Sequence, residues 1–397
     1  MKIAMVSAHA NPLAAIGGQN EHVAELSSAL ARGGHQVTVY TRRDDPDLPD
    51  QVETPQGYSV VHVQAGPARQ APKDELLQYM GPFAQYLHGQ WAANRPDVAH
   101  AHFWTSGIAT QLAAKHLNVP AVQTFHALEG VKRRHGAEDT SPRERLRLEA
   151  MVARGATWVL ATCTEELFEL MRMGRTRARM SVVPCGVNLD VFSPAGPTAA
   201  RGGLHRLVSV GRLVPRKGFD TVVRALPAIP STELVVVGGP DSTHLDVDPE
   251  ACRLRELASQ LGVADRVRLY GSVAREDMPA ILRSADVVAY TPWYEPFGIV
   301  PLEAMACGVP VVASAVGGML DTVVHDVTGR LVTSNRPAEV ADAINHLMRD
   351  EFLRHSLGAA GRDRARARYS WDRIAADALR IYDRLVPAEY ERTAATF

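Results

Sequence analysis

Two glutamates that flank a short turn, Glu295 and Glu303, are the side chains of this chain best placed for chemistry. Between them a Pro-Phe-Gly turn joins a strand-like apolar run at 285–291 to the start of a predicted helix. A helix leaves its first N–H groups without intrahelical partners, so they can bind an anion. Here those N–H groups belong to Phe297, Gly298 and Ile299. Anion-binding amides beside carboxylates that accept hydrogen bonds from hydroxyls suit a sugar attached to a phosphate.

The same spacing also fits an ordinary helix start, with Glu295 ahead of the N-terminus and Glu303 on the helix surface. A second strand-loop-helix pattern, at 210–218, carries Arg212 and Lys217. Arginine binds phosphate oxygens through a planar fork and lysine binds them as a point charge. A solvated basic loop is the alternative there. If both patterns lie at one sheet edge, together they predict a site for a sugar phosphate.

Polar residues also follow strand-like runs in the first half of the chain. His126 ends the run at 122–126, so its imidazole should lie at the carboxyl end of a strand, where open α/β sheets bind ligands. Similar strand ends carry His9, Asn11, His102 and Trp104. A loop before a predicted helix contains Ile16, Gly17, Gly18, Gln19 and Asn20. Its glycines would let the backbone approach an anion, although a tight turn without function is the alternative, and no dinucleotide fingerprint is present.

The composition places the chain among globular proteins of the soluble type. With 397 residues, two domains are expected. A formal net charge of -1 argues against a nucleic-acid-binding protein. The four cysteines are far apart and predict neither a zinc site nor a redox motif. Without a signal-peptide pattern or a membrane-spanning run, we expect a cytoplasmic protein with no integral membrane association.

Short β-branched runs alternate with longer amphipathic segments, which predicts an α/β fold with parallel sheets covered by helices. A segment at 193–203 rich in Pro, Gly and Ala predicts a linker, so we expect two doubly wound domains joined by a hinge. Helices are expected at 20–31, 75–94 and 369–382. Strands are expected at 3–7, 37–41, 59–63, 98–101, 121–125, 158–161 and 180–183, and after the linker at 207–210, 234–237, 267–270, 287–290 and 309–313.

Taken together, these motifs resemble the retaining glycosyltransferases of the GT-B fold, specifically the large family four that includes sucrose synthase-like and mycothiol-pathway enzymes. They cover most of the chain in the family's order. The motifs are Gly17-Gly18-Gln19-Asn20, Phe125-His126, the Val-Pro-Cys-Gly-Val-Asn run at 183–188 followed by Phe192, Gly211-Arg212 with Lys217-Gly218, Glu295 with Glu303, and Ala315 with Gly317-Gly318.

The resemblance implies two Rossmann-like doubly wound domains that face each other across a cleft. An acceptor-binding domain would span 1–195 and a nucleotide-sugar-binding domain 203–370, with a C-terminal helix at 371–397 crossing back to the first domain. The implied activity is retaining, metal-independent transfer of a hexose-type sugar from a UDP-, GDP- or ADP-linked donor, without a cofactor. We expect the acceptor to be a hydroxyl of a small hydrophilic metabolite.

The motif positions also imply roles for individual residues. Arg212 and Lys217 would bind the donor diphosphate, and Glu303 the ribose. Glu295 would hold hydroxyls of the transferred sugar, and His126 would touch that sugar near the reacting carbon. These assignments make His126, Arg212, Lys217 and Glu295 the expected catalytic residues. Further donor contacts are expected from Gly17, Gly18, Gly271, Val273, Phe297, Gly298 and Ile299. The expected acceptor-binding residues are His9, Asn11, Gln19, Asn20, Lys73, His102, Trp104 and Lys132.

One departure from the family pattern concerns the acceptor. Family members that recognise a phosphorylated acceptor commonly carry a hydroxyl residue just after the histidine, whereas this chain has Ala127. Lys73 and the arginines Arg143, Arg145 and Arg147 could still supply cations to a phosphate. The basic surplus between residues 130 and 180 could attract an anionic acceptor or a membrane surface, but a solvated helix face is the better interpretation. The sequence therefore leaves the charge of the acceptor open.

Two other functions stay open on the sequence alone. The first is a nucleotide-sugar epimerase or hydrolase of the same fold. The second is a non-catalytic sugar-nucleotide-binding protein, although groups at both ends of a scissile bond argue for catalysis. Formation of a homodimer is likewise open.

Overall fold

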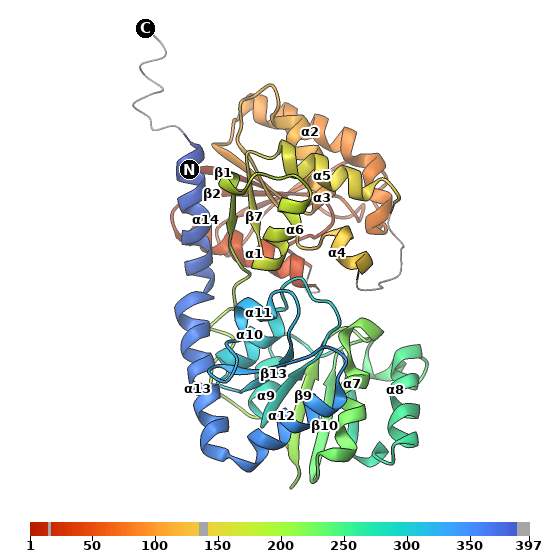
Figure 1. The fold of residues 1–397 in the computed structure, drawn as a ribbon. Coiled ribbons are helices and arrows are strands. Elements are labelled where there is room, and N and C mark those ends of the chain that lie inside the picture. Colours follow the sequence, from red (N-terminus) through yellow and green to blue (C-terminus); the bar gives the residue numbers. More distant parts are fainter. Residues whose placement is uncertain (15–16, 135–141, 387–397) are drawn as a thin grey trace. The chain divides into compact units, whose positions relative to one another are not determined.

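The computed structural model describes residues 1–14, 17–134 and 142–386. Two compact units make up the chain (Figure 1). Unit 1 comprises Met1–Cys185 and Trp371–Phe397, and unit 2 comprises Gly186–Ser370. Ile16, expected in a ligand-binding loop, lies outside the described residues.

The boundary between the units differs from the predicted one. Unit 1 ends at Cys185, before the predicted limit at residue 195, and the predicted linker at 193–203 belongs to unit 2. Arg283 fastens that segment to unit 2, because its guanidinium donates to the carbonyl oxygens of Pro197 at 2.8 Å and Ser193 at 3.0 Å. A composition rich in Pro and Gly marked irregular backbone correctly, but it did not mark the place where the chain changes units.

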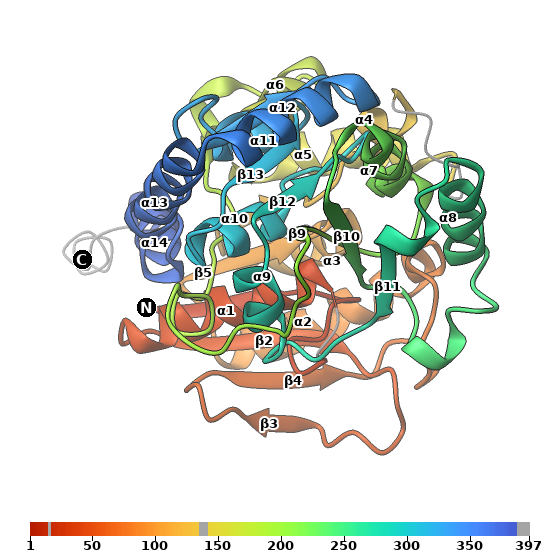
Figure 2. The same cartoon turned by 90° about the horizontal axis from the view of Figure 1, so that it is seen from below.

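Unit 1 is built on an eight-stranded sheet with the order β3-β4-β2-β1-β5-β6-β7-β8. Its strands are β1 (Lys2–Val6), β2 (Gln36–Arg42), β3 (Gln51–Glu53), β4 (Ser59–Val63), β5 (Val98–His102), β6 (Ala121–Thr124), β7 (Trp158–Ala161) and β8 (Met180–Val182). All neighbours are parallel except β3 and β4, which form an antiparallel pair at one edge (Figure 2). Because helices cover parallel sheets, inner strands are apolar along their length, and β1 is buried from Ile3 to Val6.

The helices of unit 1 are α1 (Gly18–Arg32), α2 (Met80–Ala93), α3 (Trp104–Ala114), α4 (Glu129–Arg134), α5 (Arg145–Gly155), α6 (Thr164–Arg172) and α14 (Trp371–Leu385), with 3₁₀ helices η1 (Lys73–Tyr79) and η2 (Arg177–Arg179). Phe83, Leu87 and Trp91 of α2 pack into one core cluster with Val61 and Val63 of β4.

Unit 2 is built on a six-stranded parallel sheet with the order β11-β10-β9-β12-β13-β14. The strands are β9 (His205–Val210), β10 (Thr232–Val237), β11 (Val267–Gly271), β12 (Val287–Tyr290), β13 (Val311–Ser314) and β14 (Gly329–Val332). The α-helices are α7 (Phe219–Ala225), α8 (Pro249–Gln260), α9 (Met278–Arg283), α10 (Ile299–Ala306), α11 (Met319–Thr322), α12 (Pro337–Arg349) and α13 (Glu351–Arg368). The 3₁₀ helices are η3 (Pro215–Lys217), η4 (Leu226–Ala228), η5 (Ser242–His244) and η6 (Ala264–Arg266). In the described part of the chain, no helix is both long and apolar enough to cross a membrane.

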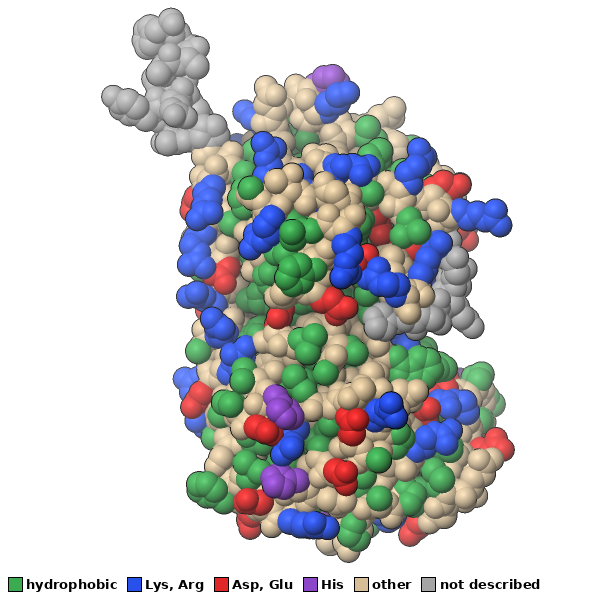
Figure 3. All heavy atoms as spheres, in the orientation of Figure 1, with side chains coloured by type: hydrophobic (Ala, Val, Ile, Leu, Met, Phe, Trp, Pro, Cys, Tyr) green, Lys and Arg blue, Asp and Glu red, His purple; other side chains and the backbone are tan. Residues whose placement is uncertain are grey.

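The C-terminal helix α14 belongs to unit 1 although it follows unit 2 in the sequence. Its inner face buries Ile374, Ala378 and Ile381. The hydroxyl of Tyr382 lies 2.7 Å from Nδ1 of His100, in the buried strand β5. On the outer face a row of basic side chains follows the helix (Figure 3). An amphipathic helix of this kind is stabilised mainly by packing of its apolar face.

The predicted strands were all found, with limits that differ by a few residues. The sequence pattern missed β3, a three-residue edge strand, and β14, whose run Gly329–Val332 contains a glycine and an arginine. The predicted helix at 75–94 is divided into η1 and α2. These elements lack the apolar periodicity by which the others were recognised.

Replacing Tyr382 with Phe should lower the free energy of unfolding of unit 1 by about 1–2 kcal/mol, because Nδ1 of His100 would stay buried without its partner. Urea denaturation followed by tryptophan fluorescence measures this, since four of the five tryptophans lie in unit 1 (Trp91, Trp104, Trp158 and Trp371). Tyr270→Phe, at a half-buried tyrosine of unit 2, is the matched control and should change stability little. Equal effects of the two substitutions would contradict this role for Tyr382.

Candidate active site

Each sheet reverses its strand order once, and the predicted site residues follow the strands at these reversals. In unit 2 the reversal lies between β9 and β12, and Arg212 and Glu295 follow these two strands. In unit 1 the reversal lies between β1 and β5. His9 follows β1, and His102 is the last residue of β5. Open α/β sheets bind ligands at such switch points, outside the carboxyl ends of the strands. The topology therefore places one candidate ligand site in each unit.

In unit 2, Lys217, Tyr290 and Glu295 form a hydrogen-bonded triad. Nζ of Lys217 lies 2.9 Å from the hydroxyl of Tyr290 and forms an ion pair with Oε2 of Glu295. The Tyr290 hydroxyl donates to the same Oε2 at 2.9 Å, and Arg216 approaches it to 3.8 Å. Burial alone would raise the pKa of Glu295, but Lys217 and Arg216 outweigh burial and hold that pKa below its ordinary value. Glu295 is therefore a carboxylate fixed in place by two cations and a phenol.

Several hydrogen-bond donors next to this triad are uncommitted. An ammonium group has three N–H donors, and Lys217 directs two of them to Tyr290 and Glu295. The exposed Arg212 makes no side-chain hydrogen bond or ion pair with any residue that the structure describes. Within the same residues, the backbone N–H groups of Phe297, Gly298 and Ile299 donate to no acceptor. Amides at the start of a helix and a free guanidinium together can bind an anion.

Two glycines determine the backbone conformation at this site. Gly218 has a φ of 69°, and a Cβ added there would overlap the carbonyl oxygen of Thr291. Gly298 precedes α10 with a φ of 77°, and an added Cβ would lie 2.6 Å from the terminal carbon of Met319. Side chains of L-residues disfavour this left-handed region. Glycine at both positions thus keeps Lys217 and the α10 amides where they are.

Glu303, on α10, is buried, so the alternative that placed it on the helix surface is wrong. Oε1 of Glu303 pairs with the guanidinium of Arg275, which also lies 4.6 Å from the ring centroid of Phe192. Burial raises the pKa of Glu303, and Arg275 opposes that rise. The sequence analysis missed Arg275, because it lies 28 positions before Glu303 and no sequence pattern connects the two. Gly271 and Val273, expected to contact the donor, lie at the end of β11 and in the loop that follows it.

Unit 1 brings together five histidines, three of which the sequence analysis had singled out (His9, His102 and His126). Nδ1 of His102 lies 2.9 Å from Nε2 of His126, and Nε2 of His100 lies 2.9 Å from Oγ1 of Thr124. The fifth ring, His22 on α1, lies against His126 with a centroid distance of 4.8 Å. His22 and His100 were missed because neither follows a strand. In the sequence, neither the helix around His22 nor the strand around His100 has a pattern that indicates a catalytic or binding role.

All five imidazoles are held neutral. Burial lowers the pKa of His9 to about 3, with Lys73 contributing, and lowers the pKa of His22 to about 4 and of His100 to about 3. Burial and the neighbouring rings lower the pKa of His102 and His126 well below the usual range. Nitrogens of His22, His102 and His126 lie within 4.8 Å of one another, close enough to share a metal ion. The direct hydrogen bond between His102 and His126 already holds two of these rings together.

The other expected acceptor residues surround the same strand ends. Asn20 donates to the carbonyl oxygen of Asn11 at 2.9 Å, and Gly17 and Gly18 lie exposed at the start of α1. Gln19 is close enough to His9 to influence its pKa. Lys73 lies 5.7 Å from the ring centroid of Phe103. His102 and Trp104 are fully buried, and Lys132 on α4 approaches the carboxylate of Glu129 to 4.0 Å.

Comparisons with known proteins show the family of the chain. The family model described as Glycosyltransferase Family 4 matches residues 16–191, and the one described as Glycosyl transferases group 1 matches residues 197–364. A D-inositol 3-phosphate glycosyltransferase from Xylanimonas cellulosilytica is 38% identical, over 96% of each chain. One from Mycobacteroides abscessus is 35% identical, over 98% of this chain and 90% of the relative. The chain belongs to glycosyltransferase family 4.

Solved structures show the fold of this glycosyltransferase. Sucrose-phosphate synthase from Thermosynechococcus elongatus is 32% identical and superimposes with a TM-score of 0.87, over 97% of this chain and 98% of that one. The Anabaena protein HepE, in complex with UDP and glucose, has a TM-score of 0.73 at 21% identity, over 96% of this chain and 98% of that one. Two Rossmann-like parallel sheets covered by helices make this a GT-B glycosyltransferase, as the sequence motifs predicted.

The neutral histidines predict that unit 1 loses stability as the pH falls. Above pH 6.5 these rings are neutral in both the folded and the unfolded chain, so they contribute no pH dependence to the free energy of unfolding. Between pH 6.5 and the folded pKa of about 3 to 4, only the unfolded chain binds protons. The free energy of unfolding therefore decreases as the pH is lowered, by about 1.4 kcal/mol per pH unit for each such histidine. His100→Asn should reduce this slope by about one histidine's share.

Urea denaturation at several pH values between 5 and 7, read by tryptophan fluorescence, measures this slope. The control is His116→Asn, at an exposed histidine of the same unit. A slope that is the same in His100→Asn as in the unmodified enzyme would show that His100 is not held neutral.

Proposed function

We propose that this family 4 enzyme transfers a hexose-type sugar from a nucleotide-diphosphate sugar to a hydroxyl of a small hydrophilic acceptor, with retention of configuration and without a metal ion. One observation carries the proposal. At the switch point of unit 2, backbone amides and the guanidinium of Arg212, which have no partner among the described residues, lie beside the largely buried pair of Lys217 and Glu295. That combination of donors and a fixed carboxylate suits a diphosphate joined to a sugar.

The chemistry follows from where charge develops. Breaking the bond between the anomeric carbon and the phosphate oxygen leaves positive charge on the sugar and negative charge on the diphosphate. Arg212 and the third N–H of Lys217 would stabilise the departing diphosphate, because prepositioned donors need not reorganise during the reaction. In this assignment Gly17 and Gly18 bind the diphosphate as well, through the backbone at the start of α1.

The two carboxylates of unit 2 have separate roles in the proposal. Glu295, fixed by Lys217 and Tyr290, would accept hydrogen bonds from hydroxyls of the transferred sugar. Glu303 would bind the ribose, for which it must share or leave its pair with Arg275. The neutral imidazole of His126 would contact the sugar near the reacting carbon, where an uncharged ring avoids repelling the developing positive charge.

The acceptor is assigned to unit 1, and the departing phosphate is proposed to help deprotonate its hydroxyl on the same face of the sugar. Relatives named as D-inositol 3-phosphate glycosyltransferases support transfer to a small polyhydroxylated molecule. The UDP complex of the Anabaena protein, which shares the fold, supports a nucleotide-linked donor. The base of the donor is left among UDP, GDP and ADP.

Nucleotide release tests the reaction class. The enzyme is incubated with UDP-, GDP- and ADP-sugars, in the presence and absence of candidate acceptors and of EDTA. Acceptor-dependent release that persists in EDTA, with an α-linked product from an α-linked donor, supports the proposal. Release without acceptor would indicate a hydrolase, formation of an epimer would indicate an epimerase, and binding without turnover would indicate a non-catalytic protein.

Lys217→Ala should lower kcat by at least about tenfold, because the departing diphosphate loses a charge-assisted donor. Arg224→Ala is the matched control, since it removes an exposed cation from α7 in the same unit and should leave kcat unchanged. Steady-state kinetics at saturating donor measures both variants. An unaltered kcat in Lys217→Ala would remove this residue from the catalytic site.

Glu303→Ala should weaken donor binding, because the ribose loses a hydrogen-bond acceptor and Arg275 loses its partner. Isothermal titration with the nucleoside diphosphate measures the change, expected at about tenfold or more in Kd. Glu256→Ala, at an exposed carboxylate of α8, serves as the control. Equal affinity in Glu303→Ala and the control would contradict the ribose assignment.

A further inference from the structure

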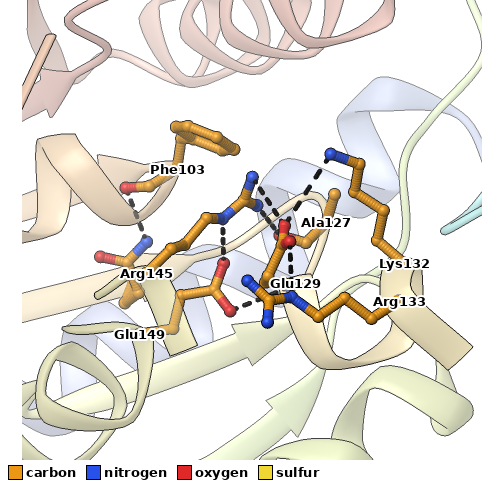
Figure 4. A network of polar contacts seen from close by, with 8 residues as sticks. Phe103, Ala127, Glu129, Lys132, Arg133, Arg145 and Glu149 are labelled. Atoms are coloured by element: carbon orange, nitrogen blue, oxygen red, sulfur yellow. Dashed lines mark hydrogen bonds and ion pairs between the residues drawn. The ribbon is translucent and has the colours of Figure 1, made fainter. Parts of the chain in front are cut away.

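We propose that the acceptor of this enzyme carries no phosphate group where it meets the end of β6, so that its substrates are uncharged polyols or sugars. The inference rests on the proposed transfer function and specifies the chemical class of the acceptor. It depends on a network of charges formed by α4 and α5 immediately after His126 (Figure 4).

The carboxylate of Glu129 already occupies the anion position of this network. Three cations converge on it: Arg145 at 3.2 Å, Arg133 at 3.0 Å and Lys132 at 4.0 Å. The side chain of Glu129 is 0% exposed, whereas those of Lys132 and Arg133 are 25% and 34% exposed. The protein therefore supplies its own anion where these cations would otherwise meet a phosphate.

The buried guanidinium of Arg145 is directed to protein oxygens at each of its three nitrogens. Its Nε donates to Glu149 at 2.8 Å, one terminal nitrogen faces Glu129 and the other donates to the carbonyl oxygen of Ala127 at 3.2 Å. The Arg145 side chain is 6% exposed, and Glu149 is fully buried on its other side. Bidentate recognition of a phosphate needs two parallel N–H donors of one arginine. Here every nitrogen of Arg145 faces an oxygen of the protein.

The side chain of the residue after His126 contributes no replacement donor. Ala127 has a methyl side chain, and its carbonyl oxygen is an acceptor taken by Arg145. Burial raises the pKa of Glu149 to about 7, although Arg145 opposes that rise. The main-chain N–H of Glu129 donates to the Glu149 carboxylate at 2.9 Å. A phosphate dianion brought to Arg145 would face two acidic side chains and a carbonyl oxygen, and the nearby Lys132 and Arg133 are already paired with Glu129. Hydroxyl groups, by contrast, can donate to such oxygens.

This specificity would set the enzyme apart from its relatives named for inositol 3-phosphate. Paired acceptors test it: myo-inositol against inositol 3-phosphate, and glucose against glucose 6-phosphate, each at constant ionic strength. The neutral member of a pair should have a kcat/KM at least about tenfold higher. A preference for the phosphorylated member would overturn the inference while leaving transfer itself established. Absence of donor binding in the same preparation would instead count against the proposed function.

A second measurement needs neither donor nor acceptor. With the proposed diphosphate site of unit 2 saturated by a nucleoside diphosphate, inorganic phosphate, compared with chloride at equal ionic strength, should not raise the Tm of the unmodified enzyme further. In Glu129→Gln, which keeps the side-chain volume but removes the charge, Arg145 is released and phosphate should raise the Tm. The same variant should gain at least about tenfold in kcat/KM for the phosphorylated acceptors relative to the neutral ones.

Glu169→Gln is the matched control. Glu169 is a buried carboxylate of α6 that pairs with Arg134 of α4 and with Arg172, so its loss frees arginines near α4 without freeing Arg145. It should leave both the phosphate response and the acceptor preference unchanged. Phosphate stabilisation of the unmodified enzyme equal to that of Glu129→Gln would show that Glu129 does not block the site.

Discussion

A charge inside a protein must be compensated, and this requirement shapes both candidate sites. Lys217 and Glu295 could not remain charged and buried apart, because leaving one partner of a buried pair alone typically costs about 3–5 kcal/mol. Their pairing fixes both groups against Tyr290, so neither has to be ordered when a ligand arrives. Compensation also leaves the triad close to neutral. Extra positive charge for a diphosphate must then come from Arg212 and from helix-start amides, which have no partners in the described residues.

The same requirement acts in unit 1 with a different result. The histidines avoid the cost of burying a charge by staying neutral. Hydrogen bonds satisfy both ring nitrogens of His100 and one nitrogen each of His102 and His126. Arg145 cannot lose its charge, so it is surrounded by Glu129 and Glu149 instead. Unit 2 therefore presents donors without partners among the described residues, whereas unit 1 presents neutral rings and paired ions. This asymmetry suits an anionic donor on one unit and an uncharged acceptor on the other.

The sequence predicted the strands and the strand-end residues well, for a physical reason. A strand buried on both faces has to be apolar along its length, and ligand-binding residues follow where such a run stops. Glu295, Lys217 and His126 were predicted in this way to lie just beyond strands, and the structure places them there. Residues distant in sequence from the groups they contact were not predicted. Arg275 lies in an ordinary loop and His22 in an ordinary helix, and neither local pattern indicates such a contact. The burial of Glu303 was likewise invisible, since only its pairing with Arg275 makes that burial tolerable.

The charge of an acceptor site is the hardest property to predict from the sequence. Counting residues between 130 and 180 shows a basic surplus, which by itself suggests an anion-binding surface. In the structure Arg143 and Arg147 are exposed on α5 or before it, whereas Arg145 between them is buried. This buried arginine donates to the carbonyl oxygen of Ala127, and it pairs with two carboxylates. A surplus of positive charge in the sequence thus becomes a paired network beside Ala127, in which three cations share two carboxylates. The local pairing, and not the regional composition, determines what that point can bind.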